Sequence, residues 1–521
     1  MIASGLSASI SESSYYKWII LANVMITTFM AVLDATVVNT ALPVIMGTLG
    51  APMNTVEWIL TGYMLSLATI LAITGWLSSK FGYKLVFIAG LAIFTFGSFM
   101  CGNSSTIGSL IFWRIVEGIG GGILMPVGMS IVSSVFPPKE RSMALGFWAV
   151  ATAASVSLGP MFGGYIVDNL NWSYIFYINV PIGIFSILFT AIVQRKEQVI
   201  SNIKFDIPGF ITFSMFLPVF LYGLTRVNSS TNAVGWSDPI VLGCMWLSAI
   251  SFLFFIIIEL SVETPLINLR LFRGKNFSFA NFVIMIFAMS MFGSTFLIPL
   301  YMQDTLGYSA FQAGLVFLPV GIIQAFASPI AGKMIKIVDV RLVIILGLIL
   351  LSGSFLLNYY LTLQTTKSYI IHSLILRGVG LGIIYPPLLA VALSRISPPD
   401  LPQASSLVNI TRQIGGSIGV ALFTFMLSER RVYHSQTYSE AINYTGQEYN
   451  NVINNLTEFY IKNGSDNHIN AIDKSKDYIV QWLDKEAYIS AINDDFMIGA
   501  LITIISIIPV LFLTVKKKKI N

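Results

Sequence analysis

The sequence predicts an all-α, polytopic membrane protein, built from two six-helix bundles in parallel repeat with two extra helices between them. Three observations predict this fold class: scarce charge, fourteen long apolar segments and an internal repeat. Of the 521 residues, 55% are hydrophobic and only 11% are charged, whereas an ordinary soluble domain carries about 25% charged residues. So few charged groups could not cover the surface of a soluble globule. The composition therefore excludes a soluble enzyme and a nucleic-acid-binding protein.

Fourteen segments are long and apolar enough to be membrane spans, because a helix needs about 20 mostly apolar residues to cross a bilayer. Loops with charges, Pro, Gly or Asn separate them. The expected spans are 18–45, 57–77, 85–102, 107–132, 142–165, 174–193, 207–226, 239–259, 277–301, 309–332, 342–362, 369–393, 404–427 and 496–515.

The basic residues of the connecting loops predict that both termini are cytoplasmic. With the N-terminus inside, nineteen Lys and Arg residues fall in inner segments, and two fall in or beside the short outer loops. Such an excess marks the cytoplasmic side. An odd number of spans would place the cluster Lys516–Lys519 outside, so an even number is expected.

An internal repeat relates the two halves of the chain. The segment Glu117–Pro126 shares three Gly, one Ile and one Pro in step with Arg377–Pro386, 260 residues later. At an offset of 257, Gly75 and its basic loop pair with Gly332 and a second basic loop. Both copies have the same orientation, as in transporters whose halves are related by an axis along the membrane normal. The predicted domains are a first bundle at 1–195, a two-helix insertion at 196–275 and a second bundle at 276–521.

One long polar insert, 428–495, is expected on the outer side within the second bundle. It carries eleven acidic and six basic residues. A small folded flap and a tethered, solvated loop both fit this composition.

Neither a metal site nor a bound nucleotide is expected. The three histidines lie far apart in the sequence, and the two cysteines lie singly in apolar segments. No phosphate-binding loop of the G-x-x-x-x-G-K-[ST] type is present, so ATP is not the expected energy source.

Charged residues inside the spans are the candidate functional groups, because a charge at bilayer depth costs at least about 2.5–3.5 kcal/mol and usually faces a partner or a cavity. Asp34 lies roughly 16 Å from the outer end of its span and Arg114 roughly 10 Å from the outer end of its own, so the two can meet. Glu117 lies one turn from Arg114. We interpret Asp34 as a site for a proton or a cationic substrate, with an affinity set by Arg114 or Glu117. A static pair that only orients helices is the alternative.

Two further arginines, Arg377 and Arg412, lie inside spans. A structural role and a role facing an anion both fit them.

Small residues in the fifth span predict close helix packing. They are Gly146, Gly159, Gly163 and Gly164, and Pro160 among them is expected to bend the helix. The bend could also seal a central cavity in one conformation.

Several of these segments resemble motifs of the major facilitator superfamily, and within it the fourteen-span drug:proton antiporter family, with multidrug efflux transporters of the EmrB and QacA type. Leu33–Pro43 resembles the first-span motif and Arg114–Gly122 the fourth-span motif. Gly75–Lys84, with Gly75, Gly82 and Lys84 retained, resembles the inner-loop motif. Gly146–Gly164 is similar to the antiporter motif of exporters.

Two stretches of the second half are also similar to the family, Pro299–Gln303 and Asn409–Gly416. By motif and depth, the cavity candidates of this half are Tyr301, Gln303, Arg377 and Arg412.

The resemblance implies a major facilitator fold and a proton-coupled secondary antiporter that exports amphipathic, often cationic drugs by alternating access. The fourth-span arginine is linked to proton transfer in the family, and Asp34 takes the place of its functional acid. The expected energy source is the proton gradient, without a cofactor, and the expected location is the bacterial inner (cytoplasmic) membrane. The expected partners are small hydrophobic or cationic substrates, protons and the lipid bilayer. Some relatives work with a periplasmic adaptor protein, which nothing in this sequence indicates.

Two other functions remain open from the sequence. One is a dedicated exporter of an endogenous lipid or metabolite. The other is a non-transporting membrane sensor that uses the outer insert as its binding module.

Overall fold

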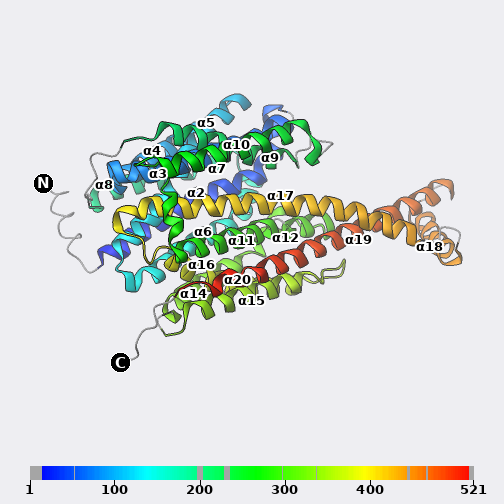
Figure 1. Cartoon of the computed structure of the whole chain (residues 1–521). Helices are drawn as coiled ribbons and strands as arrows, with labels where there is room; N and C mark the ends of the chain where they lie inside the picture. The colour runs from blue at the N-terminus through cyan, green and yellow to red at the C-terminus, as the bar shows by residue number, and fades with distance from the viewer. Residues whose placement is uncertain are drawn as a thin grey trace.

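A computed structural model describes residues 15–51, 53–195, 204–227, 235–295, 297–335, 337–442, 446–464 and 468–514, and every regular element in these ranges is helical (Figure 1). The helices of the first half are α2 (Tyr16–Leu49), α3 (Met53–Phe81), α4 (Tyr83–Gly102), α5 (Ile107–Val135), α6 (Pro138–Asn169), α7 (Tyr174–Tyr177) and α8 (Asn179–Val193). The inserted pair is α9 (Ile207–Val227) and α10 (Pro239–Ser261), with the short turns η1 (Gly235–Ser237) before α10 and η2 (Leu269–Arg273) after it.

The second half begins with α11 (Lys275–Thr295) and ends with α20 (Ile507–Leu511). Between them lie α12 (Leu297–Leu300), the π-helical η3 (Tyr301–Thr305), α13 (Ala310–Leu315), α14 (Leu318–Met334), α15 (Val340–Asn358), α16 (Lys367–Ala392), η4 (Pro398–Asp400), α17 (Leu401–Ala441), α18 (Gln447–Gly464) and α19 (His468–Ile505).

Thirteen helical segments in the described ranges are long and apolar enough to cross a membrane. They fall on thirteen of the fourteen expected spans. The remaining expected span is α6, which is 32 residues long but has only a shorter apolar stretch, Met143–Thr152, among its described residues. The described chain begins in α2 and ends after α20 at the same end of the helix bundle (Figure 1).

The internal repeat is visible in how the helices pack. In the first half α5 packs between α3 and α4, and in the second half α16 packs in the same way between α14 and α15. A methyl group on Gly120 would lie 2.7 Å from the carbonyl oxygen of Gly90, and one on Gly380 would lie 3.0 Å from that of Gly347. These pairs match at the offsets of the sequence repeat, so the same small residues bring equivalent helices together in both halves.

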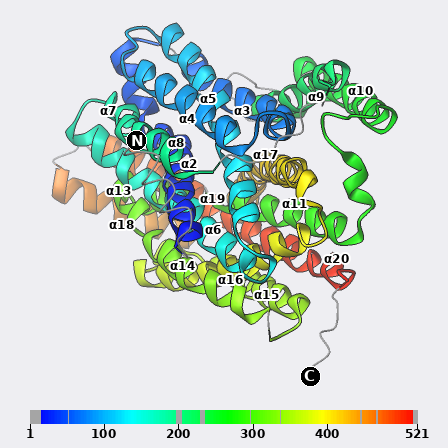
Figure 2. The same cartoon turned by 90° about the vertical axis from the view of Figure 1, so that its left-hand side faces the viewer.

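The inserted pair lies at the edge of the molecule (Figure 2). Helices α9 and α10 pack on each other, and α9 also contacts α3 and α17. The pair therefore sits against both halves. Residues 196–203, where the predicted insertion begins, lie outside the described residues.

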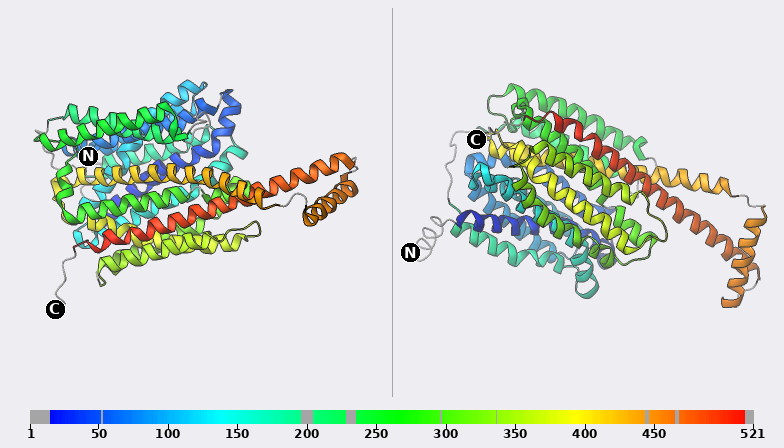
Figure 3. Two further views of the ribbon diagram at one scale, coloured as in Figure 1. Left: turned by 45° about the vertical axis from the view of Figure 1, so that its right-hand side comes forward. Right: turned by 90° about the horizontal axis from the view of Figure 1, so that it is seen from below.

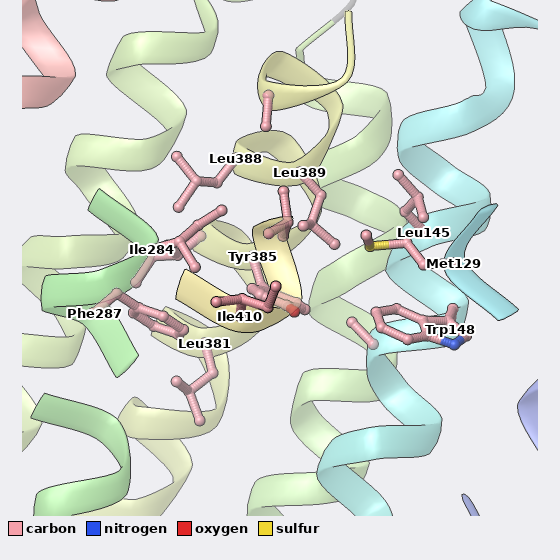
Figure 4. Close-up of a cluster of buried hydrophobic side chains, with 14 of the residues drawn as sticks. Met129, Leu145, Trp148, Ile284, Phe287, Leu381, Tyr385, Leu388, Leu389 and Ile410 are labelled. Carbon is pink, nitrogen blue, oxygen red and sulfur yellow. The ribbon is translucent and has the colours of Figure 1, made fainter. Parts of the chain in front are cut away.

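The two halves meet through α6 against α14 and through α3 against α17. Near the inner ends, a methyl group on Gly75 would lie 3.1 Å from the Cα of Gln403, and the hydroxyl of Ser406 donates to the carbonyl of Leu71. Further along, apolar side chains from both halves fill the space between them (Figure 4), among them Trp148 of α6. The inner ends of the two halves are thus in contact in this conformation.

The outer insert is largely helical, so of the two alternatives it is not a tethered loop. Helix α17 continues to Ala441, well past the expected span end at 427, and α19 begins at His468 rather than near 496. Together with α18 they form an extension that projects beyond the other helices (Figure 3). Polar contacts join its two long helices: Arg430 forms an ion pair with Asp494, Arg431 forms one with Asp484, and His434 is hydrogen-bonded to Asp494.

Candidate functional site

Asp34 and Arg114 meet inside the first half, as their depths in the sequence predict. Asp34 lies on α2 and Arg114 on α5, and the guanidinium Nη1 donates to Asp34 Oδ2 at 2.7 Å. The Asp34 residue is 1% exposed and Arg114 is fully buried. Two charged groups buried this deeply are tolerated only when they compensate each other.

Glu117 is the second acid on the same guanidinium. Its Oε2 accepts from Arg114 Nη1 at 2.8 Å and lies 3.5 Å from the Sγ of Cys101. Glu117 Oε1 and Arg114 Nη2 have no hydrogen-bond partner among the described residues. The site therefore joins two carboxyl groups to a single guanidinium, with hydrogen-bonding capacity still unused.

Asn179 is a member of this site that the sequence analysis did not identify. Its side-chain amide donates to Asp34 Oδ1 at 3.1 Å and to Ser98 Oγ at 3.0 Å, and that hydroxyl donates to the carbonyl of Phe176. The sequence offers two signals for Asn179: it is a polar residue within the expected span 174–193, and the stretch Asn179–Gly183 is similar to the family. Uncharged polar residues are common in membrane helices, so these signals alone do not select it.

Aromatic and backbone groups complete the surroundings of Arg114. The ring centroid of Tyr63 lies 4.2 Å from the guanidinium carbon, close enough for a cation–π interaction. Arg114 Nε also donates to the carbonyl of Ile59 at 3.5 Å. Helix α3 thus helps to fix the guanidinium between the two acids.

Glycines of α4 and α5 let α3, α4 and α5 approach one another closely at this site. A methyl group on Gly97 of α4 would lie 2.9 Å from the Cα of Glu117. One on Gly118 would lie 2.6 Å from the carbonyl of Tyr63. Small residues of this kind are typical where membrane helices pack at short range.

Gly120→Ala is expected to destabilise the first half by about 2 kcal/mol. The added methyl group would lie 2.4 Å from the backbone N of Phe94 and 2.7 Å from the Gly90 carbonyl, so α4 and α5 would have to separate. Gly108→Ala is the matched control in the same helix, because nothing lies within 4 Å of its Cβ position. Thermal unfolding of the purified variants measures the difference, and equal midpoints would contradict the packing argument.

Arg377 lies within the second half. Its Nη2 donates to the Met291 carbonyl at 3.1 Å, to Ser294 Oγ at 3.2 Å and to Thr295 Oγ1 at 2.8 Å. It is almost fully buried and forms no ion pair within the described residues. This arginine therefore differs from Arg114, whose charge is compensated.

The other candidates of the second half have different hydrogen-bond partners. Arg412 is half-buried and bridges the halves, with Nη2 3.3 Å from Met125 Sδ and 3.1 Å from Asn409 Oδ1. Tyr301 is buried and donates to the carbonyl of Thr362, whereas Gln303 is exposed. Among the described residues, no hydrogen bond or ion pair joins Tyr301, Gln303, Arg377 and Arg412 to one another.

The inner-loop residues form a tight turn between α3 and α4. Gly82 has φ 81°, a left-handed conformation that favours glycine. Lys84 Nζ donates to the carbonyls of Ala191 at 2.7 Å and Gln194 at 2.6 Å, which lie at the end of α8. The cation is well placed there, because it satisfies carbonyls at the negative end of a helix.

The small residues of α6 pack where the sequence predicts close contacts. A methyl group on Gly159 would lie 2.0 Å from Thr36 Oγ1 of α2, and one on Gly146 would lie 3.1 Å from the Ser328 carbonyl of α14. Gly163 and Gly164 are buried, whereas the side chain of Pro160, where a bend is expected, lies outside the described residues.

The described ranges contain no group of three or more His, Cys, Asp or Glu residues placed to hold a metal ion.

The paired halves and the buried charge site define a secondary transporter of the membrane. The chain belongs to the Major Facilitator Superfamily, whose family model matches residues 24–420. It is therefore a multi-pass membrane transporter rather than an enzyme.

Among curated relatives, the chain is 33% identical over 415 residues to the multidrug transporter protein MdtP of Bacillus subtilis, covering 80% of this chain and 76% of the relative. It is 33% identical over 424 residues to the multidrug export protein EmrB of Escherichia coli, covering 80% and 81%. It is 29% identical over 489 residues to the fatty acid resistance protein FarB of Neisseria gonorrhoeae, covering 93% of each.

Solved structures show the same fold at low sequence identity. The human organic anion transporter MFSD10 is 14% identical with a TM-score of 0.58, covering 94% of this chain and 99% of that one. The proton:xylose symporter XylE is 13% identical with a TM-score of 0.55, covering 94% and 95%.

Proposed function

We propose that this transporter exports amphipathic, often cationic drugs across the bacterial cytoplasmic membrane in exchange for protons. The observation that carries the proposal is the buried group of Asp34, Arg114 and Glu117, in which two carboxyl groups contact one guanidinium. The drug-export part rests on relatives named as multidrug transporters, MdtP and EmrB.

The charge of this group is the reason for expecting a proton there. With all three residues ionised, the group carries one negative charge in excess. An uncompensated buried charge is costly, so a closed site favours the form that holds one additional proton. When the site opens to water, the proton can leave and a cationic substrate can compensate the same charge.

Alternating access between the two halves then couples the fluxes. The halves meet through α6, α14, α3 and α17, and a substrate site between repeats is usual in such transporters. A proton that enters from outside and leaves inside would release energy for one outward movement of substrate.

The direct test is ethidium efflux from membrane vesicles, measured with and without a proton gradient. Asp34→Asn keeps the shape of the side chain but removes its charge, and we expect it to abolish gradient-driven ethidium movement. Asp473→Asn is the control, because this acid is exposed on the outer extension, and it should transport normally. Intact gradient-driven efflux in Asp34→Asn would show that this acid does not couple protons. Folded wild-type protein that moves no ethidium would contradict drug export.

Export of a dedicated lipid or metabolite is the second candidate, and Arg377 favours it. This buried guanidinium has no carboxylate partner within the described residues, so an anionic headgroup would compensate it. The relative FarB is named for fatty acid resistance. Competition separates the two functions: unrelated cations should compete with ethidium in a multidrug exporter and should not compete in a dedicated one.

A further inference from the structure

Two buried acids lie together at the base of the inserted helix pair, apart from the site described above. Asp206 immediately precedes α9, and Glu259 lies in the last turn of α10. Asp206 is 5% exposed and Glu259 is fully buried. Neither forms an ion pair with a basic residue in the part of the chain that the structure describes.

Backbone donors fix one oxygen of each carboxyl group. Asp206 Oδ1 accepts from the Gly209 N–H at 2.9 Å, and Glu259 Oε2 accepts from the Ile267 N–H at 3.2 Å. The other oxygens, Asp206 Oδ2 and Glu259 Oε1, have no hydrogen-bond partner among the described residues.

The two free oxygens converge on one space beside Gly209. A methyl group on this glycine would lie 2.4 Å from Asp206 Oδ2 and 2.7 Å from Glu259 Oε1, so the two oxygens are at most 5.1 Å apart. The absence of a side chain at Gly209 lets both carboxyl oxygens lie close to the start of α9.

Two carboxyl groups that face each other in a buried place carry an unfavourable net charge when both are ionised, and a shared cation removes it. Hard cations such as Mg²⁺ and Ca²⁺ bind carboxylate oxygens at about 2.0–2.6 Å. Bonds of this length let two carboxylate oxygens share one ion when they lie within about 4–5 Å of each other. The separation here is at most 5.1 Å.

We propose that Asp206 and Glu259 form a binding site for one divalent metal cation at the inner end of α9 and α10. Their free oxygens supply two ligands, and backbone carbonyls and water supply the others. The ion would join the entry into α9 to the segment that follows α10. Because Trp76 of α3 donates to the Lys204 carbonyl and packs on the ring of Phe205 at 4.8 Å, the site would also steady the contact with the first half.

The test uses Mn²⁺ as a paramagnetic probe on the purified full-length chain. Electron paramagnetic resonance should show one bound Mn²⁺ per chain, displaced by Mg²⁺ or Ca²⁺. Asp206→Asn and Glu259→Gln should each weaken Mn²⁺ binding at least tenfold. Glu263→Gln is the control, since this exposed acid lies in the same connection and should not change binding.

Gly209→Ala gives a second, independent test. Its methyl group would displace the two carboxylate oxygens rather than any backbone atom. We expect a folded protein, checked by thermal unfolding, that has lost Mn²⁺ binding. Unchanged binding in this variant, or in the two acid variants, would overturn the proposal. So would a wild type that binds no Mn²⁺, a result that indicates a proton shared by the two carboxyl groups. Each outcome is independent of ethidium transport.

Discussion

Arg114→Gln is expected to lower the free energy of unfolding by about 3–5 kcal/mol, because it leaves buried carboxyl groups without their compensating charge. Both Asp34 and Glu117 depend on the same Nη1 atom, at 2.7 and 2.8 Å. Thermal unfolding of the purified protein measures the loss, together with the yield of folded protein from membranes.

A combined variant separates the effect of an uncompensated charge on stability from the effect of a changed side-chain shape. Asp34→Asn, Arg114→Gln and Glu117→Gln together remove all three charges at similar volume, and we expect most of the stability to return while proton-coupled transport stays absent. Lys17→Gln is the control for a lost ion pair, because Lys17 and Glu140 are partly exposed; such pairs contribute about 0–1 kcal/mol. A single Arg114→Gln variant as stable as the wild type would contradict the compensation argument.

A disulfide between α3 and α17 is expected to stop transport almost completely. A Cβ atom on residue 75 would lie 3.1 Å from the Cα of Gln403, so the two backbones are close enough for cysteines at these positions to reach each other. Gly75→Cys with Gln403→Cys would join the inner ends of the two halves, and these ends must separate for a substrate to enter from the cytoplasm. Ethidium efflux should fall on oxidation and return on reduction.

The experiment uses a background in which Cys244 is replaced by Ser. The other native cysteine, Cys101, is buried and should not react with the oxidant. Each single-cysteine variant should be insensitive to the oxidant. A fully cross-linked protein that transports at the uncross-linked rate would show that the inner ends need not separate.

Much of the fold could be predicted because a helix that crosses the lipid bilayer must consist mostly of apolar residues. Spans must be apolar, so thirteen of the fourteen expected segments are apparent again in the structure. The repeat was visible because close packing requires small residues at fixed places, such as Gly120 and Gly380. The extension of α17 and α19 was not predicted, since helices in water need no continuous apolar run and their ends depend on contacts such as Arg431 with Asp484.

The candidate site was predictable to the extent that it consists of charges. Asp34, Arg114 and Glu117 were conspicuous because charge is rare in apolar spans. Asn179 is uncharged, and its contact with Asp34 joins residues 145 positions apart, which no local pattern reveals. The hydrogen bond from Tyr301 to the carbonyl of Thr362 could not be predicted either, because only the fold brings these two residues together.

Helix α17 runs without a break from the inner contact between the halves to the outer extension. Its 41 residues form one helix, roughly 60 Å long at 1.5 Å per residue. It begins beside Gly75 at the inner contact and ends in the outer extension, where Arg431 forms an ion pair with Asp484 of α19. A tilt of about 10° about the inner end would carry the far end roughly 10 Å. Because the helix is continuous, a change in its angle at the inner contact moves the outer extension much further than it moves the inner end, so one helix joins the inner contact to the extension.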